Sequence, residues 1–167
     1  AVYGNYKVKF SESDLPKPKN KYGVSKYNIE LLYSREFISK LSVLRLGNFI
    51  GLDTLGKKII KSVNNEITID VNKYKKSVVR TYLDKKILSR SIFEISKRLT
   101  LENQILNIGS SSGANIEDIA KFLGAKISYR IVDDFYLNDI ILDVSKLEKL
   151  IGKLEVKLNE SNSNCTG

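Results

Sequence analysis

Histidine, methionine and tryptophan are absent from the 167 residues of this chain, and cysteine occurs once, as Cys165. Without histidine the chain alone cannot supply a Ser-His-Asp triad or a Cys-His dyad, and with one cysteine we expect no zinc or other metal site. A single cysteine also allows no internal disulfide, which fits a reducing, cytoplasmic setting. Any chemistry must therefore rest on other side chains.

Long apolar runs are missing too. None approaches the roughly 20 residues that cross a bilayer, so we expect no membrane span. The hydrophobic share of 42% and the charged share of 28% are typical of a soluble globular protein. A chain of 167 residues is long enough for one domain with a real core.

Positive charge exceeds negative charge, with 28 Lys and Arg against 19 Asp and Glu and a net charge of +9. Such a balance is compatible with nucleic acid or an anionic membrane surface. The lysines, however, lie in short separate clusters such as 17–21 and 73–76, with little aromatic interleaving. We therefore interpret them as a solvated surface, with a phosphate-bearing substrate as the alternative, and expect no nucleic-acid partner.

Segments of strand-like and helix-like pattern alternate along the chain. Short apolar or alternating runs predict strands, and apolar residues at helical spacing predict helices. A helix followed by an apolar strand is the second half of a parallel crossover unit, so this order predicts an α/β protein with a parallel sheet. The expected strands are 1–4, 42–46, 67–71, 78–82, 104–108 and 126–132, and the expected helices are 20–40, 52–64, 87–99, one from about 115, and 145–151.

The first expected helix has a clear start and an apolar face. Asn20 follows the two prolines of the chain and is the candidate N-cap. Val24, Tyr27, Leu31 and Ile38 recur at helical spacing. They predict a stripe that packs on a sheet.

A glycine-rich stretch, Gly109–Gly113, follows an expected strand and precedes a helix, which is how phosphate-binding loops are built. It has neither Gly-x-Gly-x-x-Gly nor a terminal Gly-Lys-Ser/Thr, so we interpret it as a tight strand-to-helix turn. Asn115, with an acid three residues on, resembles a capping arrangement for that helix. Ser145 and Glu148 have the spacing of a capping box, and Gly152 ends the last helix.

The start of the first helix also carries a candidate catalytic pair, Tyr22 and Lys26. Residues four apart lie on one helix face, so a phenol and an ammonium can meet at one spot. A free tyrosine has a pKa near ~10, and a nearby cation lowers the pKa of a phenol. A tyrosine tuned in this way can exchange a proton with an alcohol or ketone. On spacing alone, a plain surface helix is the alternative.

The context of this pair resembles a known family. Ala1-Val2-Tyr3-Gly4, Ser11-Glu12, Pro16-Lys17-Pro18, Tyr22-Gly23-Val24-Ser25-Lys26 and Leu44-Arg45-Leu46-Gly47-Asn48 occur in this order. The set, within residues 1–150, resembles the extended short-chain dehydrogenase/reductase family, the NAD-dependent epimerases and dehydratases of nucleotide sugars.

The resemblance implies the C-terminal part of a Rossmann-like, doubly wound parallel sheet with a small α/β substrate-binding region. Residues 1–51 would complete the NAD(P)-binding domain with its catalytic helix. Residues 52–158 would form the substrate-binding region together with late sheet elements, and 159–167 a polar tail for which we expect disorder. Family members begin with a strand and a Gly-x-x-Gly-x-x-Gly turn, and their catalytic Ser or Thr would stand about two residues before Val2. We therefore expect the chain to be a piece of a longer protein.

By the same resemblance, Tyr22 and Lys26 are catalytic and also bind the cofactor, NAD or NADP. The tyrosine phenolate would take the proton from a sugar hydroxyl as hydride leaves for the nicotinamide. The lysine would lower the tyrosine pKa and bond the nicotinamide ribose. Leu46 would lie beside the nicotinamide through its backbone.

Two further residues match substrate-binding positions of the family. Asn48 matches an asparagine that contacts the nucleotide sugar, with a structural asparagine in a turn as the alternative. Arg80 matches an arginine that binds the substrate phosphates, with a surface arginine as the alternative; its planar fork of donors suits that task. Two positions depart from the family pattern. Gly47 stands where proline or phenylalanine is usual, and Thr81 stands where aspartate is usual.

The function implied for the intact protein is that of a nucleotide-sugar epimerase, dehydratase or 4-keto reductase. It would be a homodimer serving polysaccharide biosynthesis. The alternative is a non-catalytic pseudoenzyme or truncated interaction module of the same fold. The chain as printed should be inactive, bind the dinucleotide poorly, and fold incompletely or associate, because an exposed strand edge seeks a partner.

Overall fold

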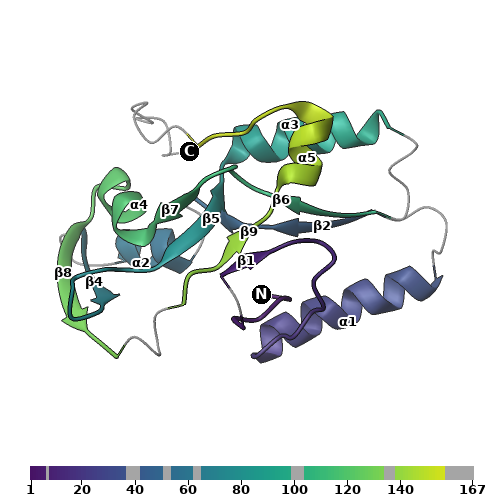
Figure 1. The fold of residues 1–167 in the computed structure, drawn as a ribbon. Coiled ribbons are helices and arrows are strands. Elements are labelled where there is room, and N and C mark those ends of the chain that lie inside the picture. The colour runs from purple at the N-terminus through teal and green to yellow at the C-terminus, as the bar shows by residue number, and fades with distance from the viewer. Residues whose placement is uncertain are drawn as a thin grey trace.

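The computed structural model describes residues 1–6, 8–36, 42–50, 54–61, 65–98, 104–133 and 138–156. It is a mixed α/β protein in which four of the five strand pairings are parallel, as the sequence predicts (Figure 1). Its elements, in order, are β1 (Lys9–Phe10), α1 (Lys21–Glu36), β2 (Val43–Leu46), β3 (Asn48–Phe49), α2 (Thr54–Lys61), β4 (Glu66–Val71), β5 (Val79–Leu83), α3 (Lys85–Ser96), β6 (Ile105–Ile108), β7 (Gly113–Asn115), α4 (Ile116–Phe122), β8 (Lys126–Ile131), β9 (Ile141–Leu142) and α5 (Ser145–Ile151).

The largest core cluster lies against the parallel pair β2–β6, in which Val43 pairs with Ile105 and Leu46 with Ile108. Helices α3 and α5 lie on one side of this pair and α1 on the other (Figure 1). Because apolar side chains from both helices and from the strands exclude water between them, this layer supplies much of the driving force for folding. The buried members are Leu83, Ile87, Leu106, Ile108, Leu147, Ile151 and Leu154.

A second parallel pair, β4–β8, has its own small core. The apolar residues of β4 alternate with polar ones, and Ile67, Ile69 and Val71 are buried against Ala120 of α4. This confirms the predicted half-exposed strand, because successive side chains of a strand point to opposite faces.

Strand β5 is the middle strand of the three-stranded sheet β3–β5–β7. It pairs in parallel with β3 and antiparallel with β7. A single bridge from Arg80 to Ile140 brings it beside β9, which itself pairs in parallel with β1. The carboxyl end of β2 therefore continues, through β3, into the strands that carry the candidate substrate residues.

The strand predicted at residues 1–4 is absent from the structure. Val2 and Tyr3 are buried, but in a turn rather than a strand. The first strand is instead Lys9–Phe10, inside the stretch that we expected to be a loop. A two-residue strand depends on its partner, here β9 more than 130 residues along the chain, so no local pattern indicates it.

The N-cap of α1 is confirmed, since the side-chain oxygen of Asn20 accepts a hydrogen bond of 2.8 Å from the Gly23 amide. The predicted apolar stripe on this helix, in contrast, is not confirmed. Val24 and Leu31 are exposed, Tyr27 is half-buried, and Ile38 lies outside the described residues. The helical spacing is present, but no sheet of the described residues covers it at those positions.

The last helix begins differently from the prediction. Ser145 is the first residue of α5, and its amide and hydroxyl both donate to Asp143, so the Ser145–Glu148 capping box is wrong. Gly152 ends the helix as expected. The stretch Gly109–Gly113 leads into strand β7, not directly into a helix, and Asn115 then caps α4 by accepting from the Glu117 amide.

Candidate active site

The first turn of α1 lies close against the chain start. Gly23 is its buried residue, and a Cβ at that position would stand 2.8 Å from the carbonyl oxygen of Ala1. Only glycine permits so close an approach of helix and backbone. Together with the Asn20 cap, this contact sets where the helix starts, and so where Tyr22 and Lys26 project.

Tyr22 and Lys26 come together on one exposed face of α1. The Lys26 ammonium nitrogen is 5.5 Å from the centroid of the Tyr22 ring. Tyr22 is 64% exposed, and Lys26 is exposed as well. The arrangement offers a phenol and a cation to one place that a bound alcohol or ketone can reach.

Leu46 and Asn48 lie where β2 ends and β3 begins. Between them, the Gly47 amide donates to the carbonyl of Ile108 at 2.9 Å and keeps the chain on β6 as it turns. Leu46 is 47% exposed and Asn48 is also exposed. Both therefore stand at the carboxyl end of a parallel strand, the edge at which open α/β sheets bind ligands.

Arg80 is half-buried on β5, beside this edge. Asn48 pairs with Tyr82, two residues beyond Arg80, so the two candidate substrate residues lie on adjacent strands. The Arg80 Nη1 donates to the backbone carbonyls of Val79 and Asn138. Burial lowers the pKa of Arg80, although the neighbouring Tyr82 and Asp139 act in the opposite direction.

Sequence reasoning missed the residue that connects α1 to β2, Arg45. Its Nη2 is 2.8 Å, and its Nε 3.2 Å, from carboxylate oxygens of Glu30 on α1. Its guanidinium carbon lies 4.6 Å from the centre of the Tyr3 ring. Tyr3 in turn donates to the Asn107 side chain at 2.8 Å. One signal was available, because a lone arginine within an apolar strand must find a partner when it is buried.

Arg45 stays protonated and positively charged in the folded protein. Burial on its own would lower the pKa of Arg45, but its contacts with Glu30 and Tyr3 outweigh burial and raise that pKa. Burial raises the pKa of Tyr3, and Arg45 opposes that shift. Arg45 is thus a permanent cation held between the chain start and the helix that carries Tyr22.

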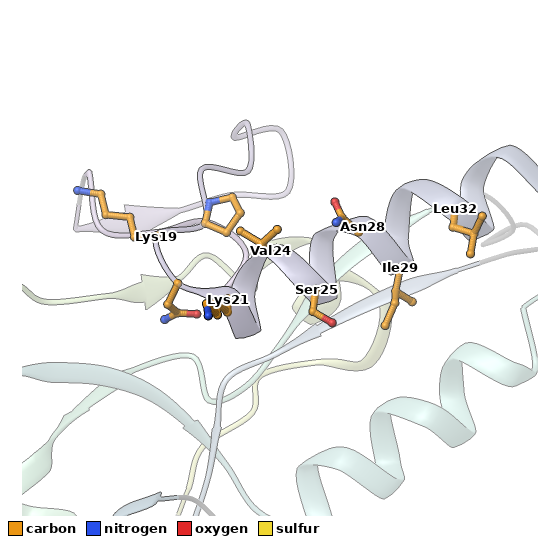
Figure 2. Close-up of a pocket in the computed structure, with 9 residues that line it drawn as sticks. Lys19, Lys21, Val24, Ser25, Asn28, Ile29 and Leu32 are labelled. Carbon is orange, nitrogen blue, oxygen red and sulfur yellow. The ribbon is translucent and has the colours of Figure 1, made fainter.

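A shallow groove runs along α1, and its lining includes neither Tyr22 nor Lys26. Figure 2 shows Val24, Ile29 and Leu32 along the helix, with Lys19 and Lys21 near its start. Ser25 and Asn28 add polar groups to the same lining, and Pro18 and Asn20 complete it. The groove is apolar along the helix and basic at its N-terminal end.

Two negative findings concern the described part of the chain. Its side chains include no group of three or more Cys, Asp or Glu residues that could hold a metal ion. None of its helices is both long and apolar enough to pass through a membrane.

No protein-family model matches the sequence, and no curated protein matches it either. The structure, in contrast, has the Rossmann-like α/β fold of nucleotide-sugar epimerases and dehydratases. Because the sequence identities to these structures are below 25%, the similarity establishes a shared fold and nothing more.

Three solved structures illustrate this fold. MoeE5 in complex with UDP-glucuronic acid and NAD has a TM-score of 0.74 and 18% identity, over 94% of this chain and 57% of that one. UDP-glucose 4-epimerase of Thermotoga maritima, with UDP-glucose, has a TM-score of 0.70 and 23% identity, over 95% and 56%. DesIV, a dTDP-glucose 4,6-dehydratase of Streptomyces venezuelae with NAD bound, has a TM-score of 0.69 and 18% identity, over 93% and 53%. The chain thus spans a little over half the length of these proteins.

Proposed function

We propose that this chain is the catalytic-helix and substrate-side portion of an NAD(P)-dependent enzyme that acts on a nucleotide sugar. The intact protein would be an epimerase, dehydratase or 4-keto reductase of the extended short-chain dehydrogenase/reductase family. One observation carries the proposal: on this fold, the exposed Tyr22 and Lys26 share one helix face with 5.5 Å between ammonium and ring centroid.

The proposed chemistry begins with Tyr22. Its phenolate accepts the proton of a sugar hydroxyl while the hydrogen on the same carbon leaves as hydride. Lys26 places a positive charge beside the Tyr22 ring and would donate to the nicotinamide ribose. NAD or NADP, when bound, supplies the hydride acceptor.

The described residues fit such a cofactor. Leu46 is exposed at the carboxyl end of parallel strand β2, where a nicotinamide would lie. The neighbours MoeE5 and DesIV were solved with NAD. Lys26 is exposed and free of any ion pair in the described part of the chain, so its ammonium is available to a ribose hydroxyl.

For the substrate, we propose that Asn48 contacts the nucleotide sugar and that Arg80 binds its phosphates. They stand on the adjacent strands β3 and β5. Nη1 of Arg80 is already engaged by backbone carbonyls, which leaves its other donor nitrogens to face a phosphate. The neighbours bind UDP-glucose or UDP-glucuronic acid, which is the substrate class we propose.

The same proposal extends to the domain division and the assembly of the intact protein. Residues 1–51 complete the cofactor domain, and 52–158 form the substrate region with late sheet elements. The predicted polar tail, 159–167, lies outside the described residues. The intact protein is a cytoplasmic homodimer of polysaccharide biosynthesis. The exposed apolar side chains of α1, among them Ile29 and Leu32, provide a surface that a second copy would cover.

The test uses the intact protein as its gene encodes it. It is incubated with UDP-glucose, UDP-glucuronic acid or dTDP-glucose and either dinucleotide, and the sugar products are identified by NMR. We expect conversion of one nucleotide sugar, with transient or net reduction of the dinucleotide. Intact protein that binds neither dinucleotide nor nucleotide sugar would refute the proposal.

The second candidate is a pseudoenzyme that keeps the fold without turnover. Arg80, tied to two carbonyls, and Thr81, buried where the family carries aspartate, favour it. This candidate predicts nucleotide-sugar binding without product.

A further inference from the structure

A buried ion pair fixes the helix of the candidate active site. Arg45 is 6% exposed and is held by Glu30 from α1 through three hydrogen bonds. On its other side it lies on the Tyr3 ring, which stacks on Phe10 with centroids 5.1 Å apart. Arg45 therefore contacts both the start of the chain and α1, while its own backbone belongs to β2, paired with β6.

Helix α1 faces the rest of the protein along one side. Most of its described side chains are exposed; Gly23 is buried, and Tyr27 and Glu30 are half-buried. These three are spaced four and three residues apart, which places them on one face of the helix. Tyr27 packs on the apolar cluster around Tyr3, and Glu30 makes the ion pair. The ion pair is thus a polar contact between this side of α1 and strand β2.

A buried ion pair such as this one adds direction more than stability. The Nη1 of Arg45 is buried without a hydrogen-bond partner among the described residues. A buried ion pair repays its desolvation poorly, and apolar replacements of similar volume are often neutral or stabilising. What an ion pair adds over apolar packing is direction, since a bidentate guanidinium–carboxylate contact fixes the rotation of the helix about its axis.

We infer that Arg45, through Glu30 and Tyr3, is the positioning residue that holds Tyr22 and Lys26 in register with the end of β2. This rests on the proposed function for its catalytic consequence. Glu30 lies one helical turn beyond Lys26 and two beyond Tyr22, and Arg45 immediately precedes Leu46. One side chain therefore connects the proton-transferring helix to the strand end where the reacting groups would meet.

The test uses the intact protein and has two arms. The first arm measures hydrogen–deuterium exchange in the R45M and E30Q variants. We expect α1 amides to exchange about tenfold faster or more, while β4 and β8 remain unchanged. The control is R130M, which removes an equally bidentate but exposed pair with Asp70 and should leave α1 unchanged. Unchanged α1 exchange in R45M, or an equal change everywhere, would overturn the inference.

The second arm separates positioning from stability. The double variant E30L/R45M replaces the pair by apolar side chains and should melt close to wild type. We expect its kcat to fall about tenfold to a hundredfold, because small misplacements of a catalytic group are costly, with KM for the nucleotide sugar within about threefold. R45K, which keeps the charge but not the fork, should be intermediate. A stable double variant with wild-type kcat would make Arg45 a simple structural residue.

The two arms keep the inference apart from the proposed function. If wild-type protein converts no nucleotide sugar, the proposed function fails while the exchange arm still decides whether Arg45 holds α1. If wild-type protein is active and α1 exchange does not respond to R45M, the inference fails and the function stands.

Discussion

The γ-methyl group of Thr81 fills the space beside Gly109, 2.3 Å from where a Cβ of residue 109 would stand. The Thr81 hydroxyl accepts a hydrogen bond of 2.7 Å from the Leu142 amide, so the side chain is held in that orientation. The Thr81 carbonyl oxygen is also 2.7 Å from the Cβ position of Gly47. Gly47 and Thr81, at which the sequence departs from the pattern it resembles, are thus in direct packing contact.

Gly109→Ala should destabilise the protein by about 1–3 kcal/mol, because the new methyl overlaps the buried Thr81 side chain. The double variant G109A/T81S should recover part of that loss, since serine lacks the overlapping methyl but keeps the hydroxyl that binds Leu142. Urea unfolding of both variants and of T81S alone measures the effect. A double variant no more stable than the sum of the single changes would contradict this packing relationship.

Tyr22→Phe should strongly lower the turnover rate of a nucleotide sugar without loss of stability. Removing a proton-transferring group costs about 10²–10⁴-fold in rate. The side chain is 64% exposed, so its hydroxyl contributes little to the folded state. Steady-state rates and thermal melting are compared with Y33F, which removes a hydroxyl from an exposed tyrosine on the same helix. Equal rates for Y22F and wild type would rule out Tyr22 as the acid/base.

Tyr3→Phe should lower the free energy of unfolding by about 1–3 kcal/mol, because it leaves the buried Asn107 oxygen without its donor. The Tyr3 hydroxyl lies 2.8 Å from that oxygen. The matched control is Y6F, whose hydroxyl donates to the carbonyl of Leu15 at an exposed site. Denaturant unfolding should separate the two variants clearly. Equal destabilisation would show that burial of the Tyr3–Asn107 bond is unimportant.

Stability should fall on acidification partly through Asp143. The side-chain and backbone hydrogen bonds from Ser145, with a smaller contribution from Lys9, lower the pKa of Asp143 in the folded state. A carboxyl whose folded pKa is depressed stabilises above its unfolded pKa of 3.8, and this stabilisation is lost as pH falls through the folded value. Melting temperatures of D143N should therefore show a shallower decline below about pH 4 than wild type. E36Q, which replaces an exposed carboxylate of α1 by its amide, is the control for the loss of one negative charge.

Local patterns predicted most of the elements because their causes are local. The alternation in β4 follows from the two-residue repeat of a strand, and Asn20 and Asn115 cap helices through amides only two or three residues away. The candidate pair Tyr22 and Lys26 could also be predicted from the sequence, because residues four positions apart on a helix lie on one face. The same kind of reasoning failed at Ser145, where Asp143 competes successfully for the hydroxyl.

What remained hidden depends on contacts between distant residues. Helical spacing fixed the apolar positions of α1, but Val24 and Leu31 are exposed because no sheet of the described residues covers them. Strand β1 forms through β9, and Tyr3 meets Asn107 across 104 positions of the chain. The sequence by itself determined the α/β class, the helix that carries Tyr22 and Lys26, and the chemistry those side chains permit. Only the tertiary structure decided that Arg45 would join that helix to β2, because Glu30 and Tyr3 become its neighbours only when the chain has folded.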